Sequence, residues 1–85
     1  MTPVRLLLLS RPGCCLCDEL EDELFAEFGP QAFAVERMDV DSRPEWRERY
    51  GLLIPVLLDE RGEVRSETRL QAELLAPLLP PSRRP

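Results

Sequence analysis

Two cysteines separated by two residues, Cys14 and Cys17, are the feature of this sequence most suited to chemistry. They follow a short apolar run at residues 4–9 and a Pro-Gly break, and they stand where a helical pattern begins. Two thiols three positions apart at a helix start lie close enough to cycle between a dithiol and a disulfide. The unpaired backbone N–H groups of a first helical turn also favour a thiolate. The placement therefore predicts redox chemistry of sulfur.

The two thiols should differ in exposure and acidity. Cys14 stands at the mouth of the expected helix, closer to the positive end of its dipole, whereas Cys17 shares an apolar stripe with Leu20 and Leu24 and should be more buried. The dipole contributes up to ~2 kcal/mol, or about 1.5 pKa units, in favour of a Cys14 thiolate. The acidic run at residues 18–23 opposes it. We therefore expect a moderately acidic Cys14 on a face that favours basic partners.

Cys15, the third cysteine, is expected to be a bystander, because neighbours in sequence bridge only through a strained ring. A role for it in mixed disulfides or cluster binding stays open. The Cys14–Cys17 pair also has two interpretations without redox activity: half of a zinc site, or two inert buried thiols. Zinc takes four ligands from cysteine, histidine or carboxylate. The sequence offers three cysteines in one segment and no histidine, so we expect no metal site.

Length and composition narrow the classes of protein. The 85 residues predict a single domain over 1–85, ordered at about 3–79, with a frayed proline-rich tail at 80–85. A net charge of −5 argues against nucleic-acid binding. The run of four leucines near the start is too short for a signal peptide or a membrane span. An odd, small number of cysteines is unlike a secreted disulfide framework, so we expect a cytoplasmic protein.

The apolar periodicity alternates between strand and helix. The predicted elements are strand 4–9, helix 17–28, strand 33–40, a helix between 42–45 and Gly51, strand 52–58, strand 63–67, and a last helix with an apolar stripe at 70–78. Ser42 and Glu45 have the spacing of a capping box, and Val64 is the main apolar residue of a polar edge strand. The first two strands should be parallel and the last two antiparallel. This order predicts an α/β fold, β-α-β-α-β-β-α, with a four-stranded mixed sheet and helices on both faces.

This order, with Cys14-x-x-Cys17 after the first strand and Ile54-Pro55 opening the third, resembles the thioredoxin fold, and more narrowly the small glutaredoxin-like proteins of bacteria. The likeness covers roughly residues 4–79. It implies a thiol–disulfide oxidoreductase in which Cys14 attacks and Cys17 resolves. It also implies a cis Pro55 facing the cysteines, which leaves the backbone of Ile54 to pair with an extended substrate. From the residues alone, a trans proline at a strand edge stays open.

The resemblance also bears on Arg11 and on glutathione. Arg11 matches a basic residue that glutaredoxins use near the thiolate and glutathione, which implies substrate binding; a solvated loop residue is the alternative. Glutathione-using glutaredoxins carry a Gly-Gly-x-Asp-like turn after the last strand, whereas residues 66–70 here contain no glycine, and Glu67 would hinder the approach of an anion. Against this, Thr68 could cap the last helix and Arg69 could attract a carboxylate. We therefore expect a protein that requires no cofactor and for which glutathione is a poor reductant.

The interpretation is thiol–disulfide exchange by a monomer. Its expected substrates are protein or small-molecule disulfides, and its expected electron donor is a reductase or a low-molecular-weight thiol, with no nucleic-acid or membrane partner. Two alternatives stay open. One is an iron–sulfur or metal-binding carrier, assembled from Cys14 or Cys15 of two chains. The other is a non-catalytic module that keeps the fold and binds partners without turnover.

Overall fold

The computed structural model describes residues 2–81. Its elements, in chain order, are β1 (Val4–Ser10), α1 (Cys15–Phe28), β2 (Phe33–Asp39), the 3-10 turn η1 (Val40–Ser42), α2 (Pro44–Tyr50), β3 (Val56–Leu58), β4 (Val64–Glu67), α3 (Ala72–Leu75) and the 3-10 turn η2 (Ala76–Leu78). The predicted β-α-β-α-β-β-α order is confirmed. The tail at 80–85 lies outside the described residues from position 82 onward, so its expected fraying stays a prediction.

The four strands form one mixed sheet in the order β2-β1-β3-β4. β1 pairs in parallel with β2 and antiparallel with β3, and β3 pairs antiparallel with β4. β1 is therefore central and has a partner on each side. The parallel register sets Ser10 opposite Asp39, so the carboxyl ends of β1 and β2 lie side by side. The loop to α1 leaves the sheet from this end.

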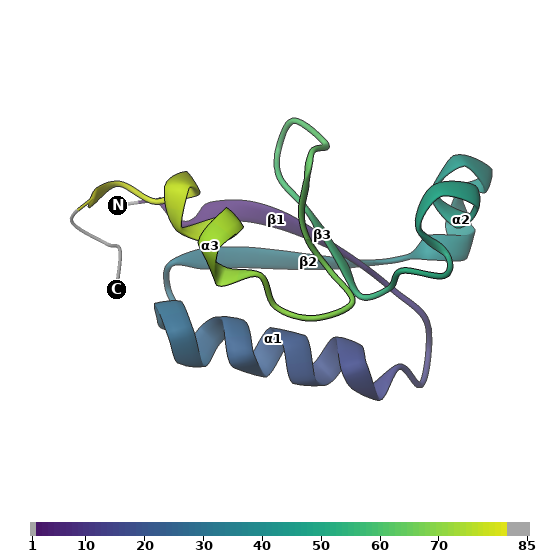
Figure 1. The fold of residues 1–85 in the computed structure, drawn as a ribbon, viewed down its shortest axis with the longest axis horizontal. Helices are drawn as coiled ribbons and strands as arrows, with labels where there is room; N and C mark the ends of the chain where they lie inside the picture. The colour runs from purple at the N-terminus through teal and green to yellow at the C-terminus, as the bar shows by residue number, and fades with distance from the viewer. Residues whose placement is uncertain (1, 82–85) are drawn as a thin grey trace.

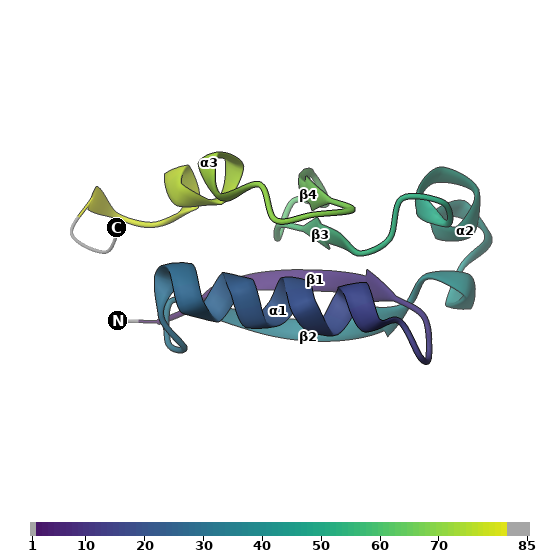
Figure 2. The same ribbon diagram turned by 60° about the horizontal axis from the view of Figure 1, so that its bottom comes forward.

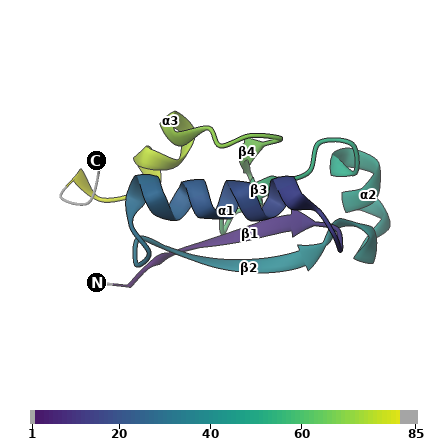
Figure 3. The ribbon, with the colours of Figure 1, turned by 90° about the horizontal axis from the view of Figure 1, so that it is seen from below.

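Side chains alternate along β1 and fill a different core on each face of the sheet. Leu6 and Leu8 pack in one cluster with residues of α1 and α3, whereas Leu9 packs in the other with Tyr50 of α2. Figures 1 and 2 show α1 lying along β1 and β2, with α2 beside the end of the sheet from which the loop to α1 departs. The view from below shows α3 at the opposite end of α1 (Figure 3). The predicted helices on both faces are confirmed.

The capping box predicted at the start of α2 is wrong. The N-cap of α2 is Arg43, whose side chain makes no capping hydrogen bond, and the helix begins directly with Pro44. The hydroxyl of Ser42 instead donates to the carbonyl of Asp39 at 2.6 Å, inside the η1 turn. The carboxylate of Asp39 accepts the N–H of Asp41 at 2.8 Å and so caps this turn. The Ser42 hydroxyl therefore forms its hydrogen bond within η1 and does not cap α2.

Two strand predictions also need correction. The run at 52–58 forms a strand only from Val56, because Leu52 and Leu53 belong to a turn and Pro55 has no N–H for a sheet ladder. In β4, Val64 is 36% exposed, whereas Ser66 is fully buried. The β3–β4 register is irregular at this point, with Leu57 opposite Ser66 and Leu58 opposite Val64. Arg65 is therefore an extra residue that breaks the alternation, and the serine, rather than the valine, lies against the core. The last helix is also short, since α3 ends at Leu75 and a 3-10 turn containing Pro77 follows.

Asp59 organises the turn between β3 and β4. One carboxylate oxygen accepts the backbone N–H groups of Arg61 at 2.8 Å and Glu63 at 3.0 Å, and the other accepts Nε of Arg65 at 2.9 Å. Burial by itself would raise the pKa of Asp59, but the hydrogen bond from Arg65 and those from the two N–H groups outweigh it. The pKa of Asp59 is therefore lowered below 3.8. The folded state favours the ionised carboxylate.

Replacing Asp59 with alanine should lower the free energy of unfolding by about 2–3 kcal/mol, because it removes the acceptor of Nε of Arg65 and of two part-buried backbone N–H groups. Urea denaturation at pH 7 measures this loss. The loss should shrink as the pH falls below 3.8, since a carboxylate with a lowered pKa stabilises the fold only while it is ionised. Glu60→Ala, at the exposed neighbour, is the matched control, with an expected change within about 0.5 kcal/mol. An equal loss in both variants would contradict the assignment.

Candidate active site

Cys14 and Cys17 are joined by a disulfide, with their Cα atoms 5.3 Å apart. Cys14 is the N-cap residue of α1 and is half-buried, whereas Cys17 lies one turn inside the helix and is 0% exposed. Cys17 lies on the buried face of α1 with Leu20 and Leu24. The predicted difference in exposure is confirmed. The geometry therefore has one sulfur that solvent can reach and a second one directly behind it.

The backbone around Cys14 is arranged to face its sulfur. The N–H of Cys17 lies 3.2 Å from Sγ of Cys14 and donates to it, as an N-cap side chain accepts from the first helical turn. The N–H of Cys14 donates to the carbonyl of Arg11 at 3.1 Å, across a turn in which Gly13 has a φ of +79°. That φ suits glycine, because a Cβ disfavours it. In the reduced protein the same N–H and the helix dipole favour a thiolate at Cys14.

Cys15 is exposed and remains a free thiol. Its Sγ lies 4.0 Å from the carbonyl of Gly13, at the limit of a weak sulfur hydrogen bond. This geometry agrees with the expectation that Cys15 stands outside the pair. Its accessory role stays a prediction.

The peptide bond between Ile54 and Pro55 is cis, as the resemblance implies. Pro55 is fully buried, and Ile54 is half-buried. The antiparallel register pairs Leu9 with Val56, so its continuation brings Pro55 level with Ser10 at the end of β1. Among residues 2–81, no group exchanges a hydrogen bond with the backbone of Ile54. That backbone is therefore open to a further strand beside the cysteine loop.

Thr68 holds the cis-proline loop in place and does not cap α3, contrary to the sequence-based expectation. Its N–H donates to the carbonyls of Leu53 at 3.0 Å and Pro55 at 2.8 Å, and its hydroxyl donates to the carbonyl of Leu53 at 3.2 Å. Thr68 adopts a φ of +66°, unusual for a β-branched residue. The N-cap of α3 is Gln71, with no capping side chain. The contacts outside its own turn fix the conformation of Thr68.

The turn after β4 uses its own polar groups internally. The hydroxyl of Ser66 donates to the carbonyl of Arg69 at 2.6 Å and accepts the N–H of Gln71 at 3.0 Å. The side-chain oxygen of Gln71 accepts the N–H of Glu67 at 3.0 Å, and the N–H of Arg69 donates to the carbonyl of Glu67 at 2.6 Å. Together with Thr68, four N–H groups of this turn therefore already have acceptors.

Arg11 turns its charge toward Asp41. Its Nε and Nη2 donate to the two carboxylate oxygens at 2.8 and 3.0 Å, and its Nη1 donates to the carbonyl of Gly51 at 2.6 Å. This hydrogen bonding raises the pKa of Arg11 and lowers that of Asp41. A Cβ at Gly51 would lie 2.5 Å from the carbonyl oxygen of Arg47 and 3.0 Å from Nη2 of Arg11. Arg11 thus ties the cysteine loop to the end of α2, and its predicted substrate contact remains untested.

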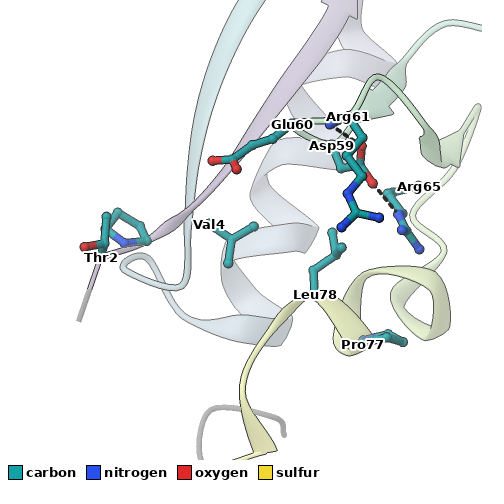
Figure 4. Close-up of a pocket in the computed structure, with 9 residues that line it drawn as sticks. Thr2, Val4, Asp59, Glu60, Arg61, Arg65, Pro77 and Leu78 are labelled. Atoms are coloured by element: carbon teal, nitrogen blue, oxygen red, sulfur yellow. Dashed lines mark hydrogen bonds and ion pairs between the residues drawn. The ribbon is translucent and has the colours of Figure 1, made fainter.

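The groove at the cysteines is smaller than a pocket elsewhere on the molecule. It has a volume of about 280 Å³, and Cys14 is part of its lining. The larger pocket, of about 560 Å³, lies near Val4 and Leu78, with the Asp59–Arg65 ion pair in its wall (Figure 4). No cysteine lines this larger pocket. The pocket with the greater volume is therefore not the one that contains the cysteine pair.

Comparison with known proteins agrees with this arrangement. A model of the glutaredoxin-like domain (DUF836) matches residues 5–79. The chain belongs to this glutaredoxin-like family. Among curated proteins, no relative matches it. The solution NMR structure of protein Ne2328 from Nitrosomonas europaea is similar, with a TM-score of 0.80 and 22% identity over 94% of this chain and 95% of that one. The thioredoxin-like fold class is confirmed.

The candidate site residues of this glutaredoxin-like chain come from two loops and from the ends of two strands. The cysteine loop, the cis-proline loop and the ends of β1 and β2 lie together, and the resemblance pointed to the first two. Sequence reasoning missed Ser10 and Asp39, which line the groove beside Cys14. The signal that would find them is their place as the last residues of two neighbouring parallel strands.

Two further findings concern metal-binding groups and membrane-spanning helices. Among residues 2–81, no group of three or more histidine, cysteine, aspartate or glutamate side chains is arranged to hold a metal ion. Within the same described part of the glutaredoxin-like chain, no helix is both long and apolar enough to cross a membrane.

Proposed function

We propose that this glutaredoxin-like protein is a thiol–disulfide oxidoreductase, with Cys14 as the nucleophile and Cys17 as the resolving thiol. The observation that carries the proposal is the pair itself: a half-exposed sulfur at the start of α1 within bonding reach of a buried one. A thiolate attacks best where it is accessible and stabilised, and a second thiol behind it limits the lifetime of mixed disulfides. Protein and small-molecule disulfides are the proposed substrates.

The reaction proceeds in two exchanges. The Cys14 thiolate attacks one sulfur of a substrate disulfide, forms a mixed disulfide and releases the other half of the substrate as a thiolate. The Cys17 thiolate then attacks the sulfur of Cys14, closes the Cys14–Cys17 disulfide and releases the second half. The substrate gains two electrons and takes up two protons from water, and the protein loses two electrons. A low-molecular-weight thiol or a reductase returns the pair to the dithiol, which a reducing cytoplasm would maintain.

The turn after β4 supports an electron donor other than glutathione. In glutathione-using relatives, this is where the resemblance places the site for a glutathione carboxylate. Here the N–H groups of Glu67, Thr68, Arg69 and Gln71 donate to acceptors of the protein itself. A carboxylate would have to displace those bonds. No bound cofactor is needed for the exchange.

A single-turnover reaction tests the proposal without knowledge of the natural donor. Reduced protein is freed of reductant and mixed with excess bis(2-hydroxyethyl) disulfide, and acid quenching, alkylation and mass spectrometry follow the loss of thiols. Because the exposed Cys15 reacts with excess disulfide by itself, Cys14→Ser is compared in the Cys15→Ser background. There it should slow the loss of thiols by about 100-fold, since it leaves only the buried thiol of Cys17. Cys15→Ser, the matched control, should stay within about twofold of the wild type. Undiminished reactivity of Cys14→Ser in that background would overturn the proposal.

A further inference from the structure

The groove beside Cys14 is built by three elements that meet at one end of the sheet. It is lined by Ser10 at the end of β1, by Asp18 in the first turn of α1, and by Arg37 and Asp39 at the end of β2. Ser10 and Asp39 are register partners, so their side chains lie on the same face, which α1 covers. Its volume of about 280 Å³ is below the roughly 300–1,000 Å³ of sites for drug-sized ligands, which suits one substrate side chain.

The two cations of the groove are already engaged. Nη2 of Arg37 lies 2.8 Å from Asp18 and 2.7 Å from Glu21. The guanidinium of Arg11 is held by Asp41 and by a backbone carbonyl. Both guanidinium groups therefore already form ion pairs within the protein, so neither is unpaired for an anionic substrate group.

Acceptors, by contrast, remain open. Ser10 is 8% exposed, and its hydroxyl has no hydrogen-bond partner among residues 2–81, although it lines the groove. The carboxylate of Asp39 uses Oδ1 to cap the N–H of Asp41 at 2.8 Å, and its second oxygen makes no hydrogen bond within the described residues. A hydroxyl oxygen and a carboxylate oxygen beside a reactive sulfur match a group that carries both N–H donors and positive charge.

We propose that this groove binds a positively charged group of the disulfide substrate, an ammonium or a guanidinium close to the reacting sulfur, with Asp39 and Ser10 as its acceptors. The inference rests on the proposed function and names the substrate class of the same site. Cationic disulfides are then the preferred substrates, and anionic ones are disfavoured by the carboxylates of Asp18, Asp39 and Asp41 around the groove.

Three small symmetric disulfides of different charge test the proposal. Reduced protein is mixed with cystamine (a dication), bis(2-hydroxyethyl) disulfide (neutral) or 3,3′-dithiodipropionate (a dianion). Each rate constant is divided by that of free 2-mercaptoethanol with the same disulfide, which removes intrinsic reactivity. At about 0.1 M salt we expect a normalised preference of about tenfold for cystamine over the neutral disulfide, and a further decrease for the dianion.

Two isosteric variants locate the preference. Asp39→Asn keeps an oxygen to cap the turn and removes the charge, and it should lower the cystamine-to-neutral ratio from about ten to about one. Glu27→Gln removes the same charge at the far end of α1, roughly 20 Å from Cys14 and about two Debye lengths away, and should leave the ratio unchanged. Ser10→Ala should produce a smaller decrease, since a neutral hydrogen bond contributes less than a charged one.

The outcomes separate the two proposals. Equal normalised rates for the three disulfides would overturn the cationic substrate and leave thiol–disulfide exchange standing. An Asp39→Asn ratio equal to that of the wild type would also overturn it, because the preference would then come from the general charge of the surface. Failure of Cys14 to react faster than the free thiol with any of the three disulfides would instead overturn the proposed function.

Discussion

In a Cys15→Ser/Cys17→Ser protein, reaction with excess bis(2-hydroxyethyl) disulfide should stop at a mixed disulfide on Cys14. About one equivalent of 2-mercaptoethanol should be retained per protein and should be visible as added mass, whereas Cys15→Ser, which keeps the Cys14–Cys17 pair and lacks the exposed third thiol, should retain almost none. The reason is geometric, because Cys17 is the thiol placed behind Cys14 and no other thiol is present in the variant. Intact-mass spectrometry under non-reducing conditions measures the adduct.

The matched control is Cys14→Ser/Cys15→Ser, which leaves Cys17 as the single thiol. Because Cys17 is 0% exposed in the folded protein, its adduct should form much more slowly than that on Cys14. Denaturant should remove this protection and allow both variants to react at the rate of an ordinary thiol. Equal trapping by the two folded variants would show that the assignment of nucleophile and resolving thiol is wrong.

The second large effect should come from the centre of the sheet. Leu8 is 0% exposed on β1, the strand with partners on both sides, and packs with residues of α1 and α3. Leu8→Ala should lower the free energy of unfolding by about 2–5 kcal/mol, through lost burial and the cavity that remains. For a chain of this length, that corresponds to a fall in Tm of roughly 10–30 °C. Urea and thermal denaturation monitored by circular dichroism measure both quantities.

The same substitution at an exposed leucine is the control. Leu52 is 99% exposed in the loop before the cis-proline, so Leu52→Ala should change the free energy of unfolding by no more than about 0.5 kcal/mol. A small effect at Leu8 would mean that the sheet centre repacks readily. A large effect at Leu52 would mean that this loop packs in solution against something that the described residues do not show.

The fold was largely predictable because its signals are local. The alternation of apolar runs with helical stripes identified each strand and helix in order, and the position of Cys17 on a stripe with Leu20 and Leu24 predicted which sulfur is buried. Element ends were less accurate, because they depend on competition between neighbours. The Ser42 hydroxyl oxygen could accept an N–H of the first turn of α2, but the hydroxyl instead donates to the carbonyl of Asp39 within η1.

The parts of the site that sequence reasoning missed depend on contacts between distant segments. Thr68 takes its conformation from carbonyls of the cis-proline loop, including one 15 residues earlier. Arg11 is oriented by Asp41, 30 residues away, and no local sequence pattern predicts that ion pair. The groove itself arises where β1 and β2 end together, which follows from the parallel register rather than from any motif. Sequence patterns identified the cysteine pair, and the topology determined which residues surround it.

The way in which Cys14 is supported has a consequence for how this protein can evolve. The hydrogen bond to its sulfur comes from a main-chain N–H, and the two arginines of the adjoining groove are held by other carboxylates. Main-chain amides are retained when surface side chains mutate, so the exterior around the cysteines can diverge while the reactivity of the sulfur persists. Under the proposed function, a lineage of such proteins can therefore exchange one set of disulfide substrates for another through surface mutations and keep the same thiol–disulfide exchange.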